Sequence, residues 1–368
     1  MAMASSNVAD VGVVQRVAVQ SACKKKLVVG NTDEYVELCS IGEGSFGAVI
    51  KARHRSTGQT VAIKLLTEHG GGGPEELLQE AQVLRDCDGV PFVVGFHGLI
   101  RAPTTGDLCL VMECLGPTLQ DVLHEQRRRR RRRRRPLLPE ATVRSVMWQL
   151  LSGAKKIHER RIVHRDIKTK NILVGGDHTL VKICDFGLAM SMVSEKPPYK
   201  PAGTLRYMAP EVLLEMPDYD AAVDTWSLGC VMAELIAGEV PFQGESEELQ
   251  LCEIFSVLGV PDAKTWPWFW STDFAADVLS GTDGVLKPNG LHERFTEKML
   301  SKEGFQVLNG LLTCNPGERL TAATALQQPW FAKVDKLVLP RKEKAPSALP
   351  KESLIVSSPK KRRKLQCV

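Results

Sequence analysis

The sequence predicts an α+β fold, with a small lobe rich in β-strands followed by a larger, mainly helical lobe. Three short runs rich in β-branched residues come first, at 35–41, 47–54 and 60–66, and Gly and polar turns separate them. Such runs are typical of antiparallel strands. From Leu119 onward the apolar residues recur with a helical period. Strands gathered in one part of a chain and helices in the other indicate the α+β class.

One main helix is predicted within the small lobe, over residues 74–87. Apolar side chains recur there at helical spacing, and Pro74 followed by two glutamates is typical of a helix N-terminus. Two further strand-like runs follow at 94–100 and 108–112. The apolar stretch 226–237 is predicted to be a buried helix, because a bilayer span needs about 20 apolar residues. We therefore expect no membrane partner.

Composition suggests that the two ends of the chain lie outside the folded unit. Residues 1–32 show no strong period and are expected to form a flexible extension. Residues 332–368 are rich in Lys, Pro and Ser and are expected to form a disordered tail. The ten cysteines are scattered, with no pair at the spacing of a zinc site, and reduced thiols are expected.

The net charge of +5 comes from two short tracts, Arg127–Arg135 and Lys360–Lys364, and the rest of the chain is acidic overall. Like charges repel along a helix, so we interpret residues 126–136 as a solvated, disordered insertion between two helices. The alternative is a nucleic-acid site at the arginine run. Because the rest of the chain is acidic, such binding would depend on the two basic tracts alone.

A glycine-rich segment, IGEGSFGAV, joins the first two predicted strands. Glycines let a backbone approach phosphates where a side chain would clash. A GxGxxG string also occurs in dinucleotide-binding folds, but there a helix follows it, whereas strands lie on both sides here. The candidate nucleotide-binding residues are Ile41, Gly42, Glu43, Gly44, Ser45, Phe46, Gly47, Ala48 and Val49.

A lysine and a carboxylate are candidates to act beside this loop. Lys64 ends the apolar run VAIK, at a distance along the chain that suits a phosphate contact. Glu80 on the predicted helix can pair with Lys64 and fix its direction. Glu76 on the same helix is the competing choice.

Two motifs in the helical part contain the other groups that phosphoryl transfer needs. In HRDIKTKN, Asp166 can accept the proton of a hydroxyl, Lys168 can neutralise the transferring phosphate, and Asn171 can bind a metal ion. In DFG, Asp185 is the second metal ligand, and APE at 209–211 follows. Chance does not account for these motifs in this order and spacing.

With these motifs, the chain resembles the protein kinases from residue 33 to 331. The resemblance implies the bilobal protein kinase fold, with an N-lobe over 33–115 and a C-lobe over 116–331. It also implies transfer of the γ-phosphoryl group of ATP to a protein substrate, with ATP and Mg²⁺ as cofactors. Lys168, two residues after the expected base, resembles the serine/threonine kinases rather than the tyrosine kinases.

Within that family, DFGLA, GEGSFGAV and IFSVLGVPDAKTWP are similar to the cyclin-dependent kinases. This similarity implies a role in cell-cycle or transcription control. By the same similarity, Met112 would be the gatekeeper, and the backbone of Glu113 and Leu115 would hold adenine. Arg319 would pair with Glu211 in a buried scaffold.

The chain departs from this group at positions that switch its members on. The cyclin-contacting helix reads PEELLQE in place of PSTAIRE, which argues against the cyclin partner that the resemblance implies. Three arginines bind a phosphothreonine in the family. They match Gln79, Arg165 and Met190, and the threonine matches Tyr199. We therefore expect that activity does not depend on that phosphothreonine. Ser45 and Tyr199 are candidate regulatory residues.

The basic cluster at 359–364 is typical of a nuclear localisation signal, so we expect a nuclear import receptor as a partner and a location in the nucleus as well as the cytoplasm. Two functions are then compared. One is an active serine/threonine kinase. The other is a catalytically idle nuclear scaffold that binds partners through the kinase fold and the arginine run. The intact catalytic motifs favour the kinase.

Overall fold

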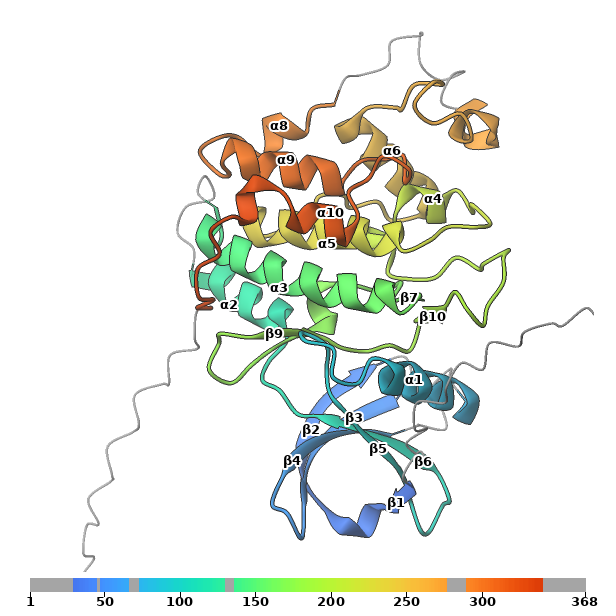
Figure 1. The fold of residues 1–368 in the computed structure, drawn as a ribbon, viewed down its shortest axis with the longest axis vertical. Helices are drawn as coiled ribbons and strands as arrows, with labels where there is room; N and C mark the ends of the chain where they lie inside the picture. The colour runs from blue at the N-terminus through green and yellow to red at the C-terminus, as the bar shows by residue number, and fades with distance from the viewer. Residues whose placement is uncertain (1–28, 45–46, 66–72, 130–135, 277–288, 340–368) are drawn as a thin grey trace, which may run out of the picture.

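The computed structural model describes residues 29–44, 47–65, 73–129, 136–276 and 289–339. A β-rich lobe lies at one end of the molecule and a larger helical lobe at the other (Figure 1). The predicted bilobal α+β architecture is confirmed. Several predictions concern residues outside the described ranges: Ser45, Phe46, the arginines at 130–135 and the basic cluster at 359–364.

A six-stranded sheet forms the smaller lobe, in the order β1-β5-β6-β4-β3-β2. The strands β1 and β5 are parallel, and the other neighbours are antiparallel. A small apolar cluster from β3, β4, β5 and β6 is buried in this lobe. The strands are β1 (Val29–Asn31), β2 (Tyr35–Gly44), β3 (Gly47–His54), β4 (Thr60–Leu65), β5 (Phe96–Arg101) and β6 (Leu108–Glu113).

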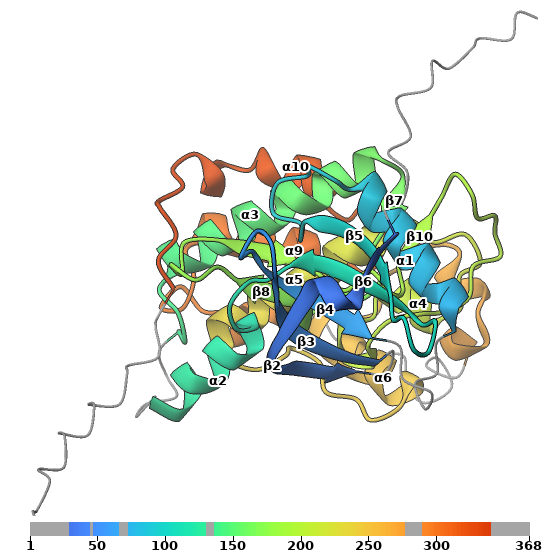
Figure 2. The same ribbon diagram turned by 90° about the horizontal axis from the view of Figure 1, so that it is seen from below.

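Helix α1 (Pro74–Asp86) packs against β5 and β6 and lies beside the sheet (Figure 2). Its buried face contains Leu77, Ala81 and Leu84, which form part of the predicted apolar stripe. Glu80 is buried on the same face. Because the apolar stripe is packed against the sheet, a charged side chain on that face is directed into the molecule.

The predicted flexible extension over residues 1–32 is wrong for its last residues. Val29–Asn31 form β1, which pairs in parallel with Leu99–Arg101 of β5, and Thr32–Glu34 form a short 3-10 helix, η1. A three-residue edge strand is too short to show a period, and its pairing partner lies about 70 residues away along the chain. Residues 1–28 lie outside the described ranges.

The larger lobe is built around α5, whose residues from Val223 to Ile236 are all buried. The predicted buried helix at 226–237 is therefore confirmed. Helix α3 packs along α5, and α9 contacts it from another side. The helices are α2 (Leu119–Arg129), α3 (Glu140–Glu159), α4 (Pro210–Leu213), α5 (Ala222–Ala237), α6 (Glu247–Leu258), α8 (Leu291–Arg294), α9 (Lys302–Leu311) and α10 (Ala322–Leu326).

The larger lobe also contains short strands and 3-10 helices. The strand pairs β7–β10 and β8–β9 are both antiparallel. These elements are β7 (Ile162–Val163), β8 (Ile172–Val174), β9 (Val181–Ile183), β10 (Met190–Ser191) and the 3-10 helices η2 (Thr169–Asn171), η3 (Leu205–Tyr207), η4 (Phe269–Ser271) and η5 (Pro329–Phe331).

A buried ion pair joins two distant parts of the larger lobe. Arg319 donates from its two terminal nitrogens to the carboxylate of Glu211, over 2.6 and 2.7 Å, and both side chains are fully buried. The guanidinium also donates to the carbonyls of Thr313, Cys314 and Ala222. The contact between Arg319 and Glu211 that the sequence predicted is present. Because every charged atom has a partner, the pair can stay buried.

The predicted disordered insertion at 126–136 is wrong for the first residues of the arginine run. Arg127, Arg128 and Arg129 continue α2, and the guanidinium of Arg127 lies 2.9 Å from Glu234 of α5. The buried carboxylate of Glu234 offsets the repulsion between neighbouring arginines, and the local sequence gives no sign of a partner more than 100 residues away. Arg129 also pairs with Glu125, one helical turn earlier.

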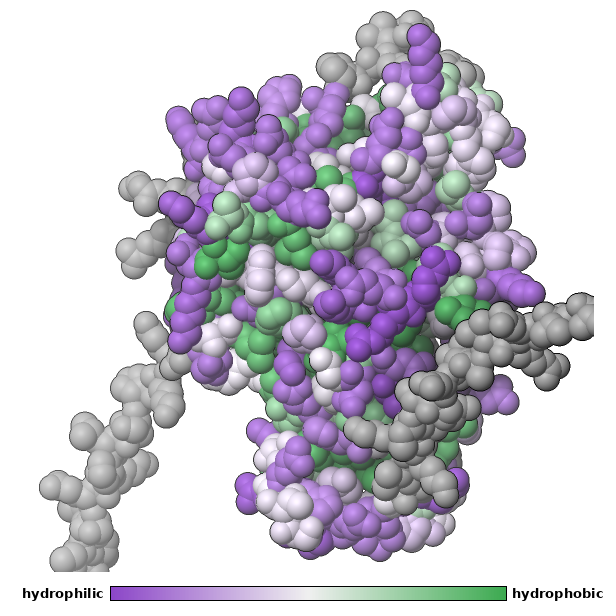
Figure 3. Space-filling model, viewed as in Figure 1, coloured by the Kyte–Doolittle hydropathy of each residue, from purple (hydrophilic) through white to green (hydrophobic). Residues whose placement is uncertain are grey.

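The predicted disordered tail is wrong for residues 332–339, which pack on the larger lobe. Leu337 and Leu339 are buried, and the backbone N–H of Leu339 donates to the carbonyl of His178 over 2.9 Å. Polar side chains cover most of the face shown in Figure 3, with apolar groups between them. Within the described ranges, no helix has the length and apolar character that crossing a membrane would require.

Candidate active site

A cavity of about 690 Å³ lies between the two lobes, and many of the predicted catalytic and nucleotide-binding residues line it. Strands β2, β3 and β4 line it from one lobe, and the loops around η2 and β9 line it from the other. Of the predicted site residues, those on its wall are Ile41, Gly42, Gly47, Val49, Lys64, Glu80, Met112, Glu113, Leu115, Asp166, Lys168, Asn171 and Asp185.

The glycine-rich hairpin forms one wall. Gly42 pairs with Val49 across the hairpin, and Gly47 has a φ of 135°, which strongly favours glycine. Ala48 pairs with Leu65 and is not on the cavity wall. Glu43 and Gly44 belong to β2.

The connection between the lobes offers backbone groups to a ligand. The N–H of Glu113 donates to the carbonyl of Gly95 over 2.9 Å, so this N–H is not available to a ligand. The side chain of Glu113 pairs with Lys182 at 2.7 Å and is held away from such a role. Leu115 and Met112 also line the cavity, together with apolar residues such as Val49, Ala62 and Leu173. An apolar slot with a few backbone polar groups suits a flat nitrogen heterocycle.

Lys64 lies between two carboxylates in the middle of the cavity. Its Nζ is 2.8 Å from Glu80 and 3.0 Å from Asp185. Burial disfavours the ammonium form, but the two carboxylates outweigh it, and the pKa of Lys64 is raised above its ordinary value. Burial likewise opposes the charge on Asp185, but Lys64 lowers its pKa below the usual value. The cation is therefore held in place and charged at neutral pH.

The competing partner, Glu76, has a different task. Its carboxylate accepts a hydrogen bond from the backbone N–H of Gly73, and so it caps the N-terminus of α1. Glu80, one helical turn further, faces Lys64. Of the two competing glutamates, Glu80 is therefore the partner of Lys64.

Asp166 is the centre of a dense hydrogen-bond network. Its Oδ2 accepts from Lys168 Nζ at 2.7 Å and from Asn171 Nδ2 at 2.9 Å. Its Oδ1 accepts from the hydroxyl of Thr204 at 2.6 Å, and Lys168 also donates to that hydroxyl. A carboxylate already oriented by two donors and contacted by a hydroxyl has the geometry of a general base.

The site can hold a divalent cation together with a phosphorylated ligand. Asn171 uses its amide nitrogen on Asp166, so its amide oxygen is the atom that can meet a cation. The Asp185 carboxylate lines the same cavity. Among the described residues, no group of three His, Cys, Asp or Glu side chains could hold a metal ion alone. Two oxygen ligands completed by phosphate and water suit Mg²⁺, which keeps several non-protein ligands.

The backbone of this site is strained in two places. Arg165 and Asp185 have φ values of 66° and 62°, in the left-handed region that few non-glycine residues adopt. Asp224 of α5 holds the first of these, because its carboxylate accepts from the N–H groups of His164 and Arg165 at 2.9 and 2.8 Å. Such strain persists only where surrounding contacts enforce it.

Two features of this surrounding network were missed as site features by the sequence analysis. Asp224 is not among the predicted site residues, yet it positions the loop that bears Asp166. Gly203, with a φ of 131°, lies so close to that loop that a Cβ there would be 2.6 Å from the carbonyl of Arg165. Both effects depend on contacts between distant segments, and the sequence carries no local signal of them.

Comparison with known proteins agrees with this geometry. Residues 35–331 match the family described as "Protein kinase domain". The chain is 44% identical to "Putative cyclin-dependent kinase F-2" of Oryza sativa subsp. japonica, covering 82% of this chain and 91% of that protein. It is 38% identical to "Cell division control protein 2 homolog 3" of Trypanosoma brucei brucei, covering 82% and 92%. It is 36% identical to "Cyclin-dependent kinase G-2" of Oryza sativa subsp. indica, over 83% of this chain but 42% of that longer protein.

The chain belongs to the protein kinase family. Within that family it is a serine/threonine kinase of the cyclin-dependent-kinase-like group, as the sequence predicted. The idle scaffold is not favoured. ATP binding and the use of a divalent metal follow from the family.

The buried carboxylate of Asp224 gives a pH-dependent prediction. Burial alone would raise its pKa, but hydrogen bonds from His158 and the backbone outweigh burial, and the pKa lies below the usual 3.8. The stabilisation is therefore present above pH 3.8 and is lost as the pH falls through the lower native pKa. We expect Asp224→Asn to lower the free energy of unfolding by about 2 to 4 kcal/mol at pH 7. Urea denaturation from pH 7 to 3 should show this difference shrinking in acid.

The exposed Asp218 provides the matched control, and Asp218→Asn should change the free energy of unfolding by less than about 0.5 kcal/mol. A loss of stability in Asp224→Asn that stays constant across this pH range would contradict the assigned role of the carboxylate.

Proposed function

We propose that this kinase transfers the γ-phosphoryl group of ATP to a serine or threonine hydroxyl with Asp166 as the general base and Mg²⁺ as the metal ion. The observation that carries the assignment is the 2.6 Å hydrogen bond from the hydroxyl of Thr204 to Asp166 Oδ1. It shows that this oxygen accepts from a hydroxyl of the threonine type at the floor of the cavity.

Each residue of the site has a separate role, which its position in the cavity sets. Asp166 takes the proton of the substrate hydroxyl while the hydroxyl oxygen bonds to the γ-phosphorus and the bond to the ADP oxygen breaks. Lys168, 2.7 Å from Asp166, lies where it can offset charge on the transferring group. Lys64 offers its ammonium to the other phosphates while Glu80 holds it in place. When bound at Asn171 and Asp185, Mg²⁺ would supply further positive charge to the phosphate oxygens.

The test is the substitution Asp166→Asn, which keeps the size of the side chain and removes the base. We expect kcat for phosphorylation of a generic serine peptide to fall by about 100- to 10,000-fold. Binding of ATP, followed by calorimetry, should change little because Asp166 is not among the residues proposed to hold the nucleotide or its metal ion. The control Asp218→Asn should retain full activity.

Two results would contradict this assignment. Equal activity in Asp166→Asn and the unmodified protein would show that the measured activity comes from a contaminant. An unmodified protein that binds ATP but phosphorylates no protein or peptide would favour the scaffold instead.

We also propose that the segment from Asp185 to Glu211 is held in place without a phosphothreonine. Arg165, the one arginine retained from the family's set of three, already has other partners. Its Nε donates to the carbonyl of Leu188 at 2.7 Å, and its terminal nitrogen donates to the hydroxyl of Tyr219 at 3.1 Å. The same hydroxyl donates to the carbonyl of Lys200 at 2.6 Å.

The surroundings of Arg165 also disfavour a phosphate. Met190, at the position of the second arginine, is fully buried in β10, and Gln79, at the position of the third, is exposed and uncharged. Tyr199 packs edge-on against Tyr219, with ring centroids 5.6 Å apart. One guanidinium in an apolar setting cannot bind a phosphate as three can. The Tyr219 hydroxyl supplies a neutral link in its place.

The matched pair Tyr219→Phe and Tyr199→Phe separates these roles. Tyr219→Phe removes the link, and we expect kcat/KM for a peptide to fall by roughly 3- to 10-fold, the worth of one or two hydrogen bonds. Tyr199→Phe keeps the packed ring and should retain activity. Phosphatase treatment of the unmodified protein should leave the rate unchanged. A rate that disappears after phosphatase treatment and returns with a phosphothreonine would overturn the proposal.

A further inference from the structure

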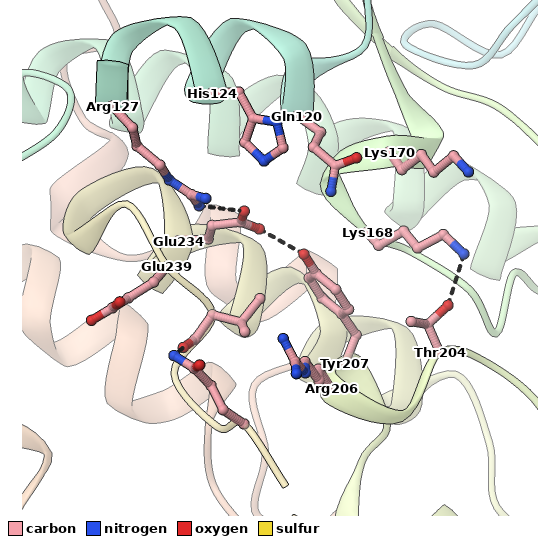
Figure 4. A pocket seen from close by; sticks show the side chains of 12 residues that line it. Gln120, His124, Arg127, Lys168, Lys170, Thr204, Arg206, Tyr207, Glu234 and Glu239 are labelled. Atoms are coloured by element: carbon pink, nitrogen blue, oxygen red, sulfur yellow. Dashed lines mark hydrogen bonds and ion pairs between the residues drawn. The ribbon is translucent and has the colours of Figure 1, made fainter. Parts of the chain in front are cut away.

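A second cavity, of about 520 Å³, lies beside the loop that contains Asp166 (Figure 4). One face of α2 lines it, where Gln120, His124 and Arg127 follow each other at helical spacing. The loop before η2 with η2 itself, the segment around η3, and the end of α5 with the residues after it complete the wall. We call this cavity the basic pocket, and these further lining residues are Lys168, Lys170, Thr204, Arg206, Tyr207, Glu234, Glu239, Val240 and Gln243.

The basic pocket adjoins the nucleotide cavity at the catalytic base. Lys168, Lys170 and Thr204 line both cavities, and Lys168 and Thr204 are hydrogen bonded to Asp166. A peptide whose hydroxyl reaches Asp166 therefore passes the opening of the basic pocket. Since an extended chain advances about 3.3 to 3.6 Å per residue, a side chain within about one to four residues of the target can enter it.

The acidic group deep in the pocket is already neutralised. Glu234 is buried, and Arg127 donates to one of its oxygens at 2.9 Å. The other oxygen accepts from the hydroxyls of Tyr207 and Thr169, at 2.7 and 3.1 Å. Figure 4 shows the contacts of Arg127 and Tyr207 with Glu234. With these partners, Glu234 has little negative potential left to attract a basic side chain.

Uncompensated positive charge remains on the pocket wall. Among the described residues, neither Lys170 nor Arg206 is within ion-pair distance of a carboxylate, and both are exposed. Lys168 adds a third cation next to them, although it is paired with Asp166. The remaining carboxylate of the wall, Glu239, is exposed and in Figure 4 lies across the pocket from Lys168 and Lys170.

We propose that the basic pocket binds an anionic side chain of the protein substrate, close to the hydroxyl that is phosphorylated. Phosphoserine is the preferred occupant, because it carries more charge than a carboxylate and its three oxygens can meet a guanidinium and an ammonium together. This inference rests on the proposed function and adds a substrate class to it: proteins that are acidic, or already phosphorylated, beside the target residue.

Arg127 has a specific part in this preference. It is the first residue of the arginine run, and it occupies the carboxylate that would otherwise present a buried negative charge to the pocket. Removing the guanidinium would leave Glu234 to attract lysine or arginine from the substrate. The run therefore contributes through its first member, Arg127, which turns the pocket from acidic to basic.

The experiment is a set of serine peptides in which each position from four before to four after the target carries alanine, aspartate, phosphoserine or lysine. For the unmodified protein, we expect phosphoserine at one or two adjacent positions to raise kcat/KM about tenfold or more over alanine. Aspartate should give a smaller gain, and lysine a loss. The double substitution Lys170→Glu with Arg206→Glu should remove the gain and make lysine the better residue there.

A second readout does not depend on turnover. Fluorescence anisotropy of a labelled peptide should show the phosphoserine form binding about tenfold more tightly than the alanine form, and the double variant should lose this difference. The control Lys298→Glu with Lys302→Glu makes the same change of net charge at exposed residues outside the pocket, and it should keep the preference. Arg127→Gln should shift the preference toward lysine.

These readouts separate the two proposals. Peptides phosphorylated without any charge preference, or a preference that survives the double substitution in the pocket, would overturn the basic pocket and leave the proposed function intact. Phosphopeptide binding that the double substitution abolishes, in a protein that transfers no phosphate, would contradict the proposed function and support the pocket.

Discussion

The cavity between the lobes depends on one buried cation with two acidic partners. Lys64 lies on β4, Glu80 on α1 and Asp185 on the segment that follows β9, so the ion pairs join the sheet, the main helix of the small lobe and the larger lobe. Lys64 and Glu80 are buried, and each alone would be costly to bury without the other, whereas the Asp185 side chain is 38% exposed and adds its negative charge from the edge of the cavity. Displacement of α1 would leave the charge on Lys64 partly unmatched. The position of this helix is therefore coupled to the alignment of the catalytic groups.

The base is held by a second set of contacts, which all reach back to α5. Asp224 near the start of this helix fixes the backbone before Asp166, and Glu234 near its end binds the segment around Tyr207. Both carboxylates are buried within the most enclosed helix of the lobe. The nucleotide side and the substrate side of the site thus share one rigid support. On the proposal made above, this arrangement is ordered without a phosphate, because neutral and internal partners satisfy the charged groups.

Much of the fold and of the site could be predicted from residue types and spacing. The strands, the helix with Glu80 and the motifs around Asp166 and Asp185 have local patterns, since glycines, periods and catalytic groups repeat at short range. The edge strand at Val29–Asn31, the Arg127–Glu234 pair and the packed residues 332–339 have none. Each of these depends on partners about 70 to 190 residues away in the chain, and composition alone suggested disorder. The arginine run is the clearest case. Its ion pair with the buried carboxylate of Glu234 keeps Arg127 in a helix despite the repulsion between neighbouring arginines.

The most direct test of this account is a double-mutant cycle between Lys64→Met and Glu80→Gln, measured as kcat/KM for a serine peptide. If the glutamate acts by holding the lysine, the two losses should not multiply. The double variant should then lie within about threefold of Lys64→Met alone. Independent losses that multiply in the double variant would contradict the account, since Glu80 would then contribute in a way that does not pass through Lys64.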